Sequence, residues 1–229
     1  MSEPPATPVE QEHPPITSPP RRKKRRLHFL RELPVLVVIA FVLALLIKAF
    51  IVQAFYIPSG SMEPTLDIGD RVLVEKLFTH PHRGWIVVFT NPHPTPQPHR
   101  NPVAAFFHWL SEGFGVSTPA NEDFIKRVIA LPGQTVDIRH GAVYVDGTRV
   151  NEPYVSPVKD TSSFGPCRVP ADRVFVMGDN RTQSSDSRVD FGTGAGIRNG
   201  RCVGAIRVSS IVGRAFVSIW PFSRIHWLG

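Results

Sequence analysis

The sequence predicts a mainly β domain preceded by one transmembrane helix. A long apolar run, Leu33 to Ile47, contains no charged residue and follows the basic block Arg21–Arg26. Downstream, short segments rich in β-branched residues are separated by Gly, Pro, Asn or Asp. No segment of helical periodicity alternates with them, so a parallel α/β sheet is not expected. The 229 residues fit one mid-sized all-β domain with additional segments.

The N-terminal part is expected to form a disordered cytoplasmic tail, residues 1–30, and a transmembrane anchor, residues 31–56. The first 20 residues are rich in Pro, Glu and Thr and cannot bury enough surface to offset chain entropy. Pro34 suits a first helical turn, and Pro34–Tyr56 as a helix would be about 34 Å long, against a hydrocarbon core of about 30 Å. Lys48 lies close enough to the far interface to snorkel.

The basic block sets the expected topology. Positive charge is retained on the cytoplasmic side, so residues 57–229 should lie outside the cytoplasm and the chain should be a single-pass protein of the plasma membrane. A cleaved signal peptide is the alternative, because Val52–Ala54 resembles a small-residue cleavage site. The leader would then exceed about 30 residues, which favours an uncleaved anchor.

The predicted strands lie in residues 70–77, 84–90, 124–131, 135–147, 172–179 and 210–220. Asp146-Gly147 is a hairpin signal. Residues 90–124 form an insertion, first rich in Pro and His and then apolar. Its second part is expected to be either a surface helix that contacts the bilayer or a buried loop segment.

Composition argues against several classes of function. The net charge of +7 suggests a membrane-surface or nucleic-acid partner, but no basic stripe interleaved with aromatic residues supports nucleic-acid binding. Histidines gather around the insertion without metal-ligand spacing, so neither a metal nor a cofactor is expected. Residues 178–192 are acidic, but Arg181 and Arg188 within them favour Asp–Arg pairs over calcium. Ser156–Lys159 matches S-x-x-K without the companion motifs, which we interpret as chance.

Four ordered blocks carry a resemblance: "SGSMEPTL" (59–66), "GDRVLVEK" (69–76), "KRVIALPGQTV" (126–136) and "MGDNRTQSSDSR" (177–188). With the anchor and "IVGRA" (211–215), they resemble bacterial type I signal peptidases over Ile57 to Pro221. Residues 189–208 are longer and more glycine-rich than is usual in that family, and Ala130 and Gln134 also depart from its pattern.

The resemblance implies a catalytic domain of mostly antiparallel β structure in two packed parts, which cleaves signal peptides from exported preproteins after small residues. Ser61 would be the nucleophile, Lys126 the general base, and Ser184 the residue that orients the lysine amine. Ser59 would form the oxyanion hole with the Ser61 N–H. The supporting ion pairs would come from Asp179, Arg127, Asp186 and Arg188.

A lysine base is physically demanding. At a pKa near 10.4 only about 1 lysine in 2,500 is neutral at pH 7. Lowering the pKa by ~3 units raises the neutral fraction to roughly a third, and this shift requires about 4 kcal/mol of desolvation. The apolar "VIALP" after Arg127 could provide a dry wall, with Arg127 directed to the opposite face of the strand from Lys126.

Two rival classes and one covalent feature complete the expectations. The rivals are a catalytically inactive, membrane-tethered β module and a self-cleaving, repressor-like Ser-Lys protein; the latter should begin with a DNA-binding domain. Cys167 and Cys202 flank the "GDNR" block, and an oxidising compartment would favour a disulfide between them. The expected partners are preprotein signal peptides and the lipid bilayer; the sequence predicts no oligomeric state.

Overall fold

The computed structural model describes residues 25–77, 80–91, 123–189, 191 and 194–228. Most of the predicted tail and nearly all of the 90–124 insertion lie outside these residues. The chain divides into two units, residues 1–44 and 45–229, which are described separately.

The helix α1, Arg25–Phe50, differs from the predicted anchor at both ends. It begins nine residues before Pro34, which therefore lies inside the helix and not in its first turn. Arg and Leu, good helix formers, precede the proline and extend the helix upstream. Within the described part of the chain, no helix is both long enough and apolar enough to cross a membrane.

The predicted helix end at Tyr56 was wrong, because Val52–Tyr56 forms the strand β1. It pairs antiparallel with β2, Arg71–Glu75, from Val52 opposite Glu75 to Tyr56 opposite Arg71. The partner strand satisfies the backbone groups of an apolar segment that local pattern alone assigns to a helix.

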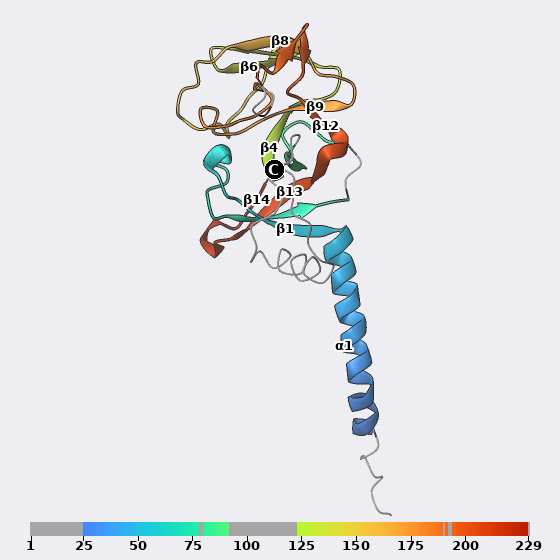
Figure 1. Cartoon of the computed structure of the whole chain (residues 1–229). Helices are drawn as coiled ribbons and strands as arrows, with labels where there is room; N and C mark the ends of the chain where they lie inside the picture. The colour runs from blue at the N-terminus through green and yellow to red at the C-terminus, as the bar shows by residue number, and fades with distance from the viewer. Residues whose placement is uncertain (1–24, 78–79, 92–122, 190, 192–193, 229) are drawn as a thin grey trace, which may run out of the picture. The chain divides into compact units, whose positions relative to one another are not determined.

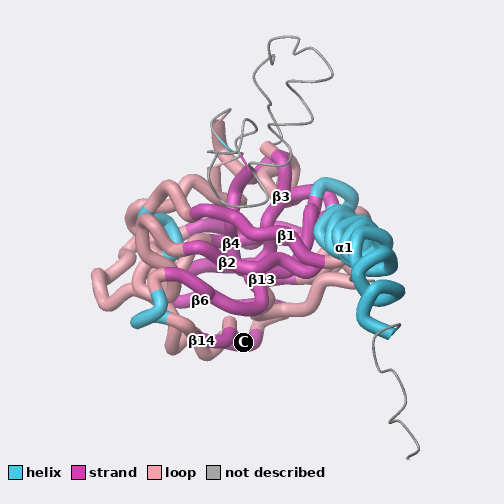
Figure 2. Tube along the Cα trace, turned by 90° about the horizontal axis from the view of Figure 1, so that it is seen from below, coloured by secondary structure: helices cyan, strands magenta, loops and turns pink. Residues whose placement is uncertain are grey.

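The larger sheet holds eight strands in the order β1-β2-β13-β3-β4-β9-β12, with β14 paired to β13. Figures 1 and 2 label several of these strands from two directions. All of its pairs are antiparallel. The strands not yet bounded are β3 (Ile86–Thr90), β4 (Asp123–Ala130), β9 (Arg173–Met177), β12 (Ile206–Arg207), β13 (Ile211–Trp220) and β14 (His226–Trp227).

The smaller sheet has the order β10-β11-β8-β5-β6-β7. Among its pairs, β8 with β11 is parallel and the others are antiparallel. Its strands are β5 (Thr135–Arg139), β6 (Ala142–Val145), β7 (Thr148–Arg149), β8 (Phe164–Arg168), β10 (Ile197–Arg198) and β11 (Arg201–Cys202). The predicted hairpin at Asp146-Gly147 is confirmed, with φ of 50° and 77° at the two turn residues.

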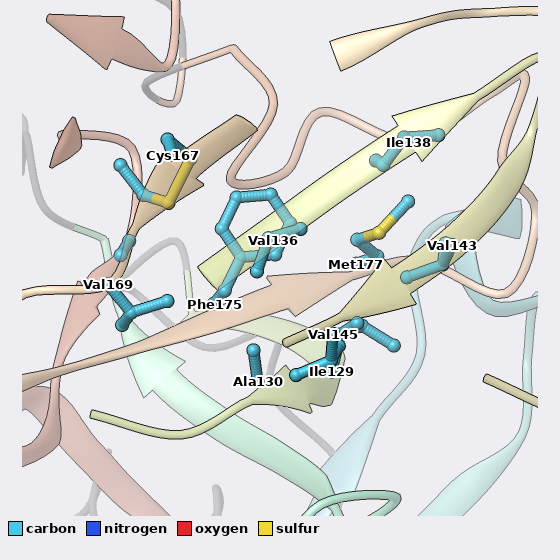
Figure 3. Close-up of a cluster of buried hydrophobic side chains, with 12 residues drawn as sticks. Ile129, Ala130, Val136, Ile138, Val143, Val145, Cys167, Val169, Phe175 and Met177 are labelled. Carbon is cyan, nitrogen blue, oxygen red and sulfur yellow. A yellow bond between two sulfur atoms is a disulfide. The ribbon is translucent and has the colours of Figure 1, made fainter. Parts of the chain in front are cut away.

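The mainly β, antiparallel fold class is therefore confirmed, and the two sheets share a core. One buried cluster takes Ile129, Ala130, Phe175 and Met177 from β4 and β9, and Val136, Ile138, Val143 and Val145 from the smaller sheet (Figure 3). Cys167 and Cys202 lie in this cluster and form a disulfide. In Figure 1, β4 and β9 lie between the label β8 of the smaller sheet and the labels β1 and β14 of the larger one. The long strand β4 thus reaches both parts of the domain.

Candidate active site

A short 3₁₀ turn, η1 (Gly60–Met62), holds Ser61 at the end of the segment that follows β1. Met62 and Leu66, both fully buried, fix the turn in the core of the larger sheet. The Ser61 side chain is itself buried. Burial of the flanking apolar residues thus brings a hydroxyl, which would prefer water, into a largely dry position.

Lys126 reaches this hydroxyl from the middle of β4. Its Nζ lies 2.7 Å from Ser61 Oγ and donates to the Ile125 carbonyl at 2.9 Å. The residue is only 3% exposed. Burial lowers the pKa of Lys126 to about 8, although the charges of Asp186 and Asp179 act in the opposite direction. A substantial fraction of this amine is therefore neutral near pH 8 and can accept a proton.

Arg127, the next residue on β4, makes a separate buried pair with Asp179. Its Nε and Nη2 donate to the two carboxylate oxygens at 2.9 and 2.7 Å. Thr65 Oγ1 donates to the same carboxylate at 2.6 Å. The Tyr154 ring packs against the guanidinium, 3.9 Å from its Cζ. The pair links β4, the loop after β9 and the segment after the Ser61 turn.

A second pair, Asp186 with Arg188, closes the loop after β9. Arg188 donates through Nε and Nη2 at 2.9 and 3.0 Å, and the Gly178 N–H donates to Asp186 at 3.2 Å. Arg181 forms a two-pronged pair with Glu152, at 3.0 and 2.6 Å. Arg188 thus makes the predicted Asp–Arg pair, whereas Arg181 pairs with Glu152, a residue outside the acidic stretch.

Asn180 is a residue that the sequence analysis missed. Its side-chain Nδ2 donates to the Gly60 carbonyl and its backbone N–H to the Ser61 carbonyl, both at 3.1 Å. Two hydrogen bonds from the loop after β9 thus hold the turn that carries Ser61. Gly178 makes the close approach possible, since a Cβ there would lie 2.4 Å from Ser61 O and 2.3 Å from Ser184 Oγ.

The structure does not join Ser184 and Ser59 to the Ser61–Lys126 pair by hydrogen bonds. Ser184 Oγ is buried beside Gly178 and has no hydrogen-bond partner among the described residues. Ser59 has an extended backbone, caps no helix end with its side chain, and is exposed. Both serines flank the Ser61 turn, but their roles stay predictions.

Residues 151–163 also contribute unforeseen contacts. Besides Glu152 and Tyr154, the Ser156 N–H donates to the Asp179 carbonyl at 3.0 Å and Asp160 pairs with Arg188 at 3.1 Å. Glu152 and Asp160 each pair with an arginine of the 177–188 block that lies 29 or 28 residues away, so no local sequence pattern indicated these contacts. Ser156 makes its contact with the Asp179 carbonyl through its backbone N–H.

Comparison with known proteins agrees with these motifs. Residues 30–220 match the family model described as "Signal peptidase, peptidase S26". A signal peptidase I of Leptolyngbya laminosa is 40% identical over 195 residues, covering 83% of this chain and 80% of that protein. A signal peptidase I of Mycobacterium tuberculosis is 36% identical over 236 residues, covering 91% and 78%.

Among solved structures, a signal peptidase I of Enterococcus faecalis aligns with a TM-score of 0.38 and 25% identity, covering 60% of this chain and 97% of that one. The family match covers most of the chain, and the resemblance drawn from the four sequence blocks is confirmed. The chain belongs to the signal peptidase family, peptidase S26, and is a serine endopeptidase.

Proposed function

We propose that this protein cleaves signal peptides from exported preproteins with a Ser61–Lys126 dyad. The observation that carries the proposal is the 2.7 Å separation of Lys126 Nζ and Ser61 Oγ. A serine becomes a strong nucleophile only when a base removes its proton, and a lysine serves only when it is neutral. The lowered pKa of Lys126, about 8, meets that requirement.

The chemistry takes place in two halves. Neutral Lys126 accepts the Ser61 proton while Oγ attacks the scissile carbonyl, and the resulting ammonium returns that proton to the leaving amine as the peptide bond breaks. A water then enters, Lys126 takes its proton, and the hydroxide attacks the acyl-serine. The proton passes to Ser61 Oγ as the ester bond breaks.

The developing oxyanion needs donors. The Ser61 N–H and the Ser59 hydroxyl are the proposed pair of donors. The exposed Ser59 side chain makes no helix-capping hydrogen bond that would have to break when substrate binds.

We assign Ser184 to the orientation of the lysine amine. Among the described residues its buried Oγ has no hydrogen-bond partner, which supports that assignment, because a bond to Lys126 would satisfy it.

Asp179 and Asp186 carry charges that would hold Lys126 protonated if they were unpaired. Arg127 and Arg188 each take up one of these carboxylates in a two-pronged pair. The loop is therefore held by two charge pairs, in which each arginine offsets part of the charge of its aspartate.

We place the enzyme at the plasma membrane, with residues 57–229 outside the cytoplasm. Every side chain from Glu32 to Ala44 is exposed, and nearly all of them are apolar. At the other end of the chain, Trp220, Phe222, Ile225 and Trp227 are exposed on and around β13 and β14. Exposed aromatic residues of this kind suit a membrane–water interface. The bilayer would also concentrate the preprotein, whose signal peptide is an apolar segment.

Cleavage of a model preprotein by the detergent-solubilised full chain tests the proposal. Ser61→Ala and Lys126→Ala should each abolish cleavage, and Lys126→Arg should not restore it, because arginine stays charged. Ser209→Ala and Lys159→Ala, at exposed positions, are the matched controls and should retain full activity.

Three results contradict the proposal. Turnover by either active-site alanine variant would end the Ser-Lys assignment. Absence of cleavage by the wild type would favour an inactive module, and shortening of the chain itself without preprotein cleavage would favour a self-cleaving protein.

A protease added outside sealed cells tests the topology. It should digest the chain after Tyr56 and spare the residues before Arg31; the reverse pattern would overturn the proposed topology.

A further inference from the structure

Three exposed arginines, Arg168, Arg198 and Arg201, form a row across the β8–β11–β10 edge of the smaller sheet, which we term the arginine row. Arg198 lies opposite Arg201 in the antiparallel pair, and Arg201 lies opposite Arg168 in the parallel pair. Residues directly opposite each other on neighbouring strands project from the same face, about 5 Å apart. Three arginine side chains therefore leave one face of the sheet side by side, and Arg168 Nε donates to the Gly133 carbonyl at 3.1 Å.

The local sequence makes this arrangement rigid. Asn199 and Gly200, with φ of 50° and 68°, form the two-residue turn between β10 and β11, so the arginines on either side of it must face each other. The Arg168 N–H donates to the Gly200 carbonyl at 2.8 Å. Cys167 and Cys202, the inward-facing neighbours of Arg168 and Arg201, form the disulfide. The disulfide thus links β8 and β11, the two strands that carry Arg168 and Arg201.

Like charges placed directly opposite each other destabilise a sheet. Within the described residues, none of the three arginines forms an ion pair that would offset this cost. Asp146 is close enough for Arg168 to help lower its pKa, but its carboxylate mainly accepts from the Thr135 N–H and the Gln134 amide. A bound anion would supply the missing counter-charge.

The positive surface continues into a hollow of about 810 Å³ beside the row. Arg201 lines it together with Arg173 and Arg207, against a single described carboxylate, Asp172. Arg173 is oriented by donation to the Val203 and Ala205 carbonyls at 3.0 and 2.8 Å. A chain-like ligand lying on the row could therefore extend into a second basic site.

The composition of this surface selects the ligand. Its cations are all arginine, whose planar fork matches phosphate oxygens in pairs. No large apolar residue is exposed in 164–169 or 197–207, so nothing here would insert into a bilayer. The Tyr144 ring of the same sheet is occupied by Arg139, 4.9 Å from its centroid, and is not a free platform for stacking bases.

We propose that the arginine row binds a linear polyanion that carries phosphodiester groups but no nucleobases, of the type of poly(glycerol phosphate). Arg198 and Arg201 lie on β10 and β11, Arg168 lies on β8, and none of the three belongs to the Ser61–Lys126 site. Binding there would retain the enzyme at a polyanionic surface without taking part in peptide cleavage.

The test measures binding of poly(glycerol phosphate) to the detergent-solubilised full chain at several salt concentrations. The variant Arg198→Gln/Arg201→Gln removes two of the three charges. The control Arg149→Gln/Lys159→Gln removes two exposed charges elsewhere, one of them on β7 at the opposite edge of the same sheet. Preprotein cleavage is measured on every variant.

We expect the row variant to lose about tenfold or more in affinity at 0.15 M salt, with the slope of log affinity against log salt reduced by about 1.5. The control should change less than about twofold, and both variants should cleave preprotein at the wild-type rate. Equal losses in the two variants would mean that net charge alone drives binding and would overturn the proposal. So would no saturable binding by the wild type, or tighter binding to single-stranded DNA or to phosphatidylglycerol vesicles than to the polymer.

Discussion

Breaking the buried Arg127–Asp179 pair should strongly destabilise the catalytic domain, and Asp179→Asn does so by removing the charge of one partner. The two hydrogen bonds are 2.9 and 2.7 Å long, and the side chains are 7% and 0% exposed. Removing one partner of such a pair leaves a buried charge uncompensated and costs about 3–5 kcal/mol. Thr65 Oγ1 would also lose its charged acceptor.

Asp137→Asn is the matched control. Asp137 pairs with Arg139 at a comparable separation, 2.6 Å, but that arginine is 65% exposed. Solvent-exposed ion pairs contribute about 0–1 kcal/mol to the free energy of unfolding, so the same substitution should have little effect at Asp137.

Thermal unfolding of the solubilised chain, followed by near-UV circular dichroism, compares the two variants. For a domain of this size about 1 kcal/mol shifts Tm by about 2–4 °C, so Asp179→Asn should lower Tm by about 10 °C and Asp137→Asn by less than about 3 °C. Equal shifts in the two variants, or a shift below about 3 °C for Asp179→Asn, would refute the view that burial makes breaking this pair costly.

Three further substitutions test separate parts of the account. Gly178→Ala places a Cβ 2.4 Å from Ser61 O and should lower kcat about 100-fold by displacing the nucleophile turn; wild-type kcat would show that the loop can yield. Replacing Cys167 and Cys202 together by Ala opens a link between residues 35 apart and should cost about 4 kcal/mol in urea unfolding, so a loss below about 1 kcal/mol would contradict the chain-entropy reasoning. Ser184→Ala should lower kcat while KM stays constant, because the amine loses its orientation; an unchanged kcat would remove Ser184 from the mechanism.

The ordered motif blocks located both residues of the proposed dyad, because their chemistry depends on residue type at fixed positions. The same blocks named Arg127, Asp179, Asp186 and Arg188 as ion-pair residues, but which aspartate pairs with which arginine came only from the structure. The contacts of Asn180 and Thr65 were not indicated by the sequence, since short polar side chains take whichever partner the fold brings near. Asn180 lies 120 residues from Gly60 in the chain.

The strand β1 shows a second limit of prediction from the sequence. Val52–Tyr56 continues an apolar run whose composition suits either a helix or a buried strand, and only the presence of β2 beside it decides. The same is true of the arginine row, where strand pairing places Arg168 beside Arg201, 33 residues away in the sequence. Pairing across sheets is set by the whole chain and not by a local window.

The central claim, that neutral Lys126 is the catalytic base, is tested most directly by kcat/KM for a signal-peptide substrate from pH 5 to 10.5 in detergent. The protonated amine cannot accept a proton, so activity should be low at acid pH and rise as pH passes the lysine pKa in the free enzyme. Burial sets that pKa at about 8, so we expect the rising limb of the profile there. A profile already flat by pH 6, or a limb near pH 6.5 that disappears when a histidine is replaced, would contradict it.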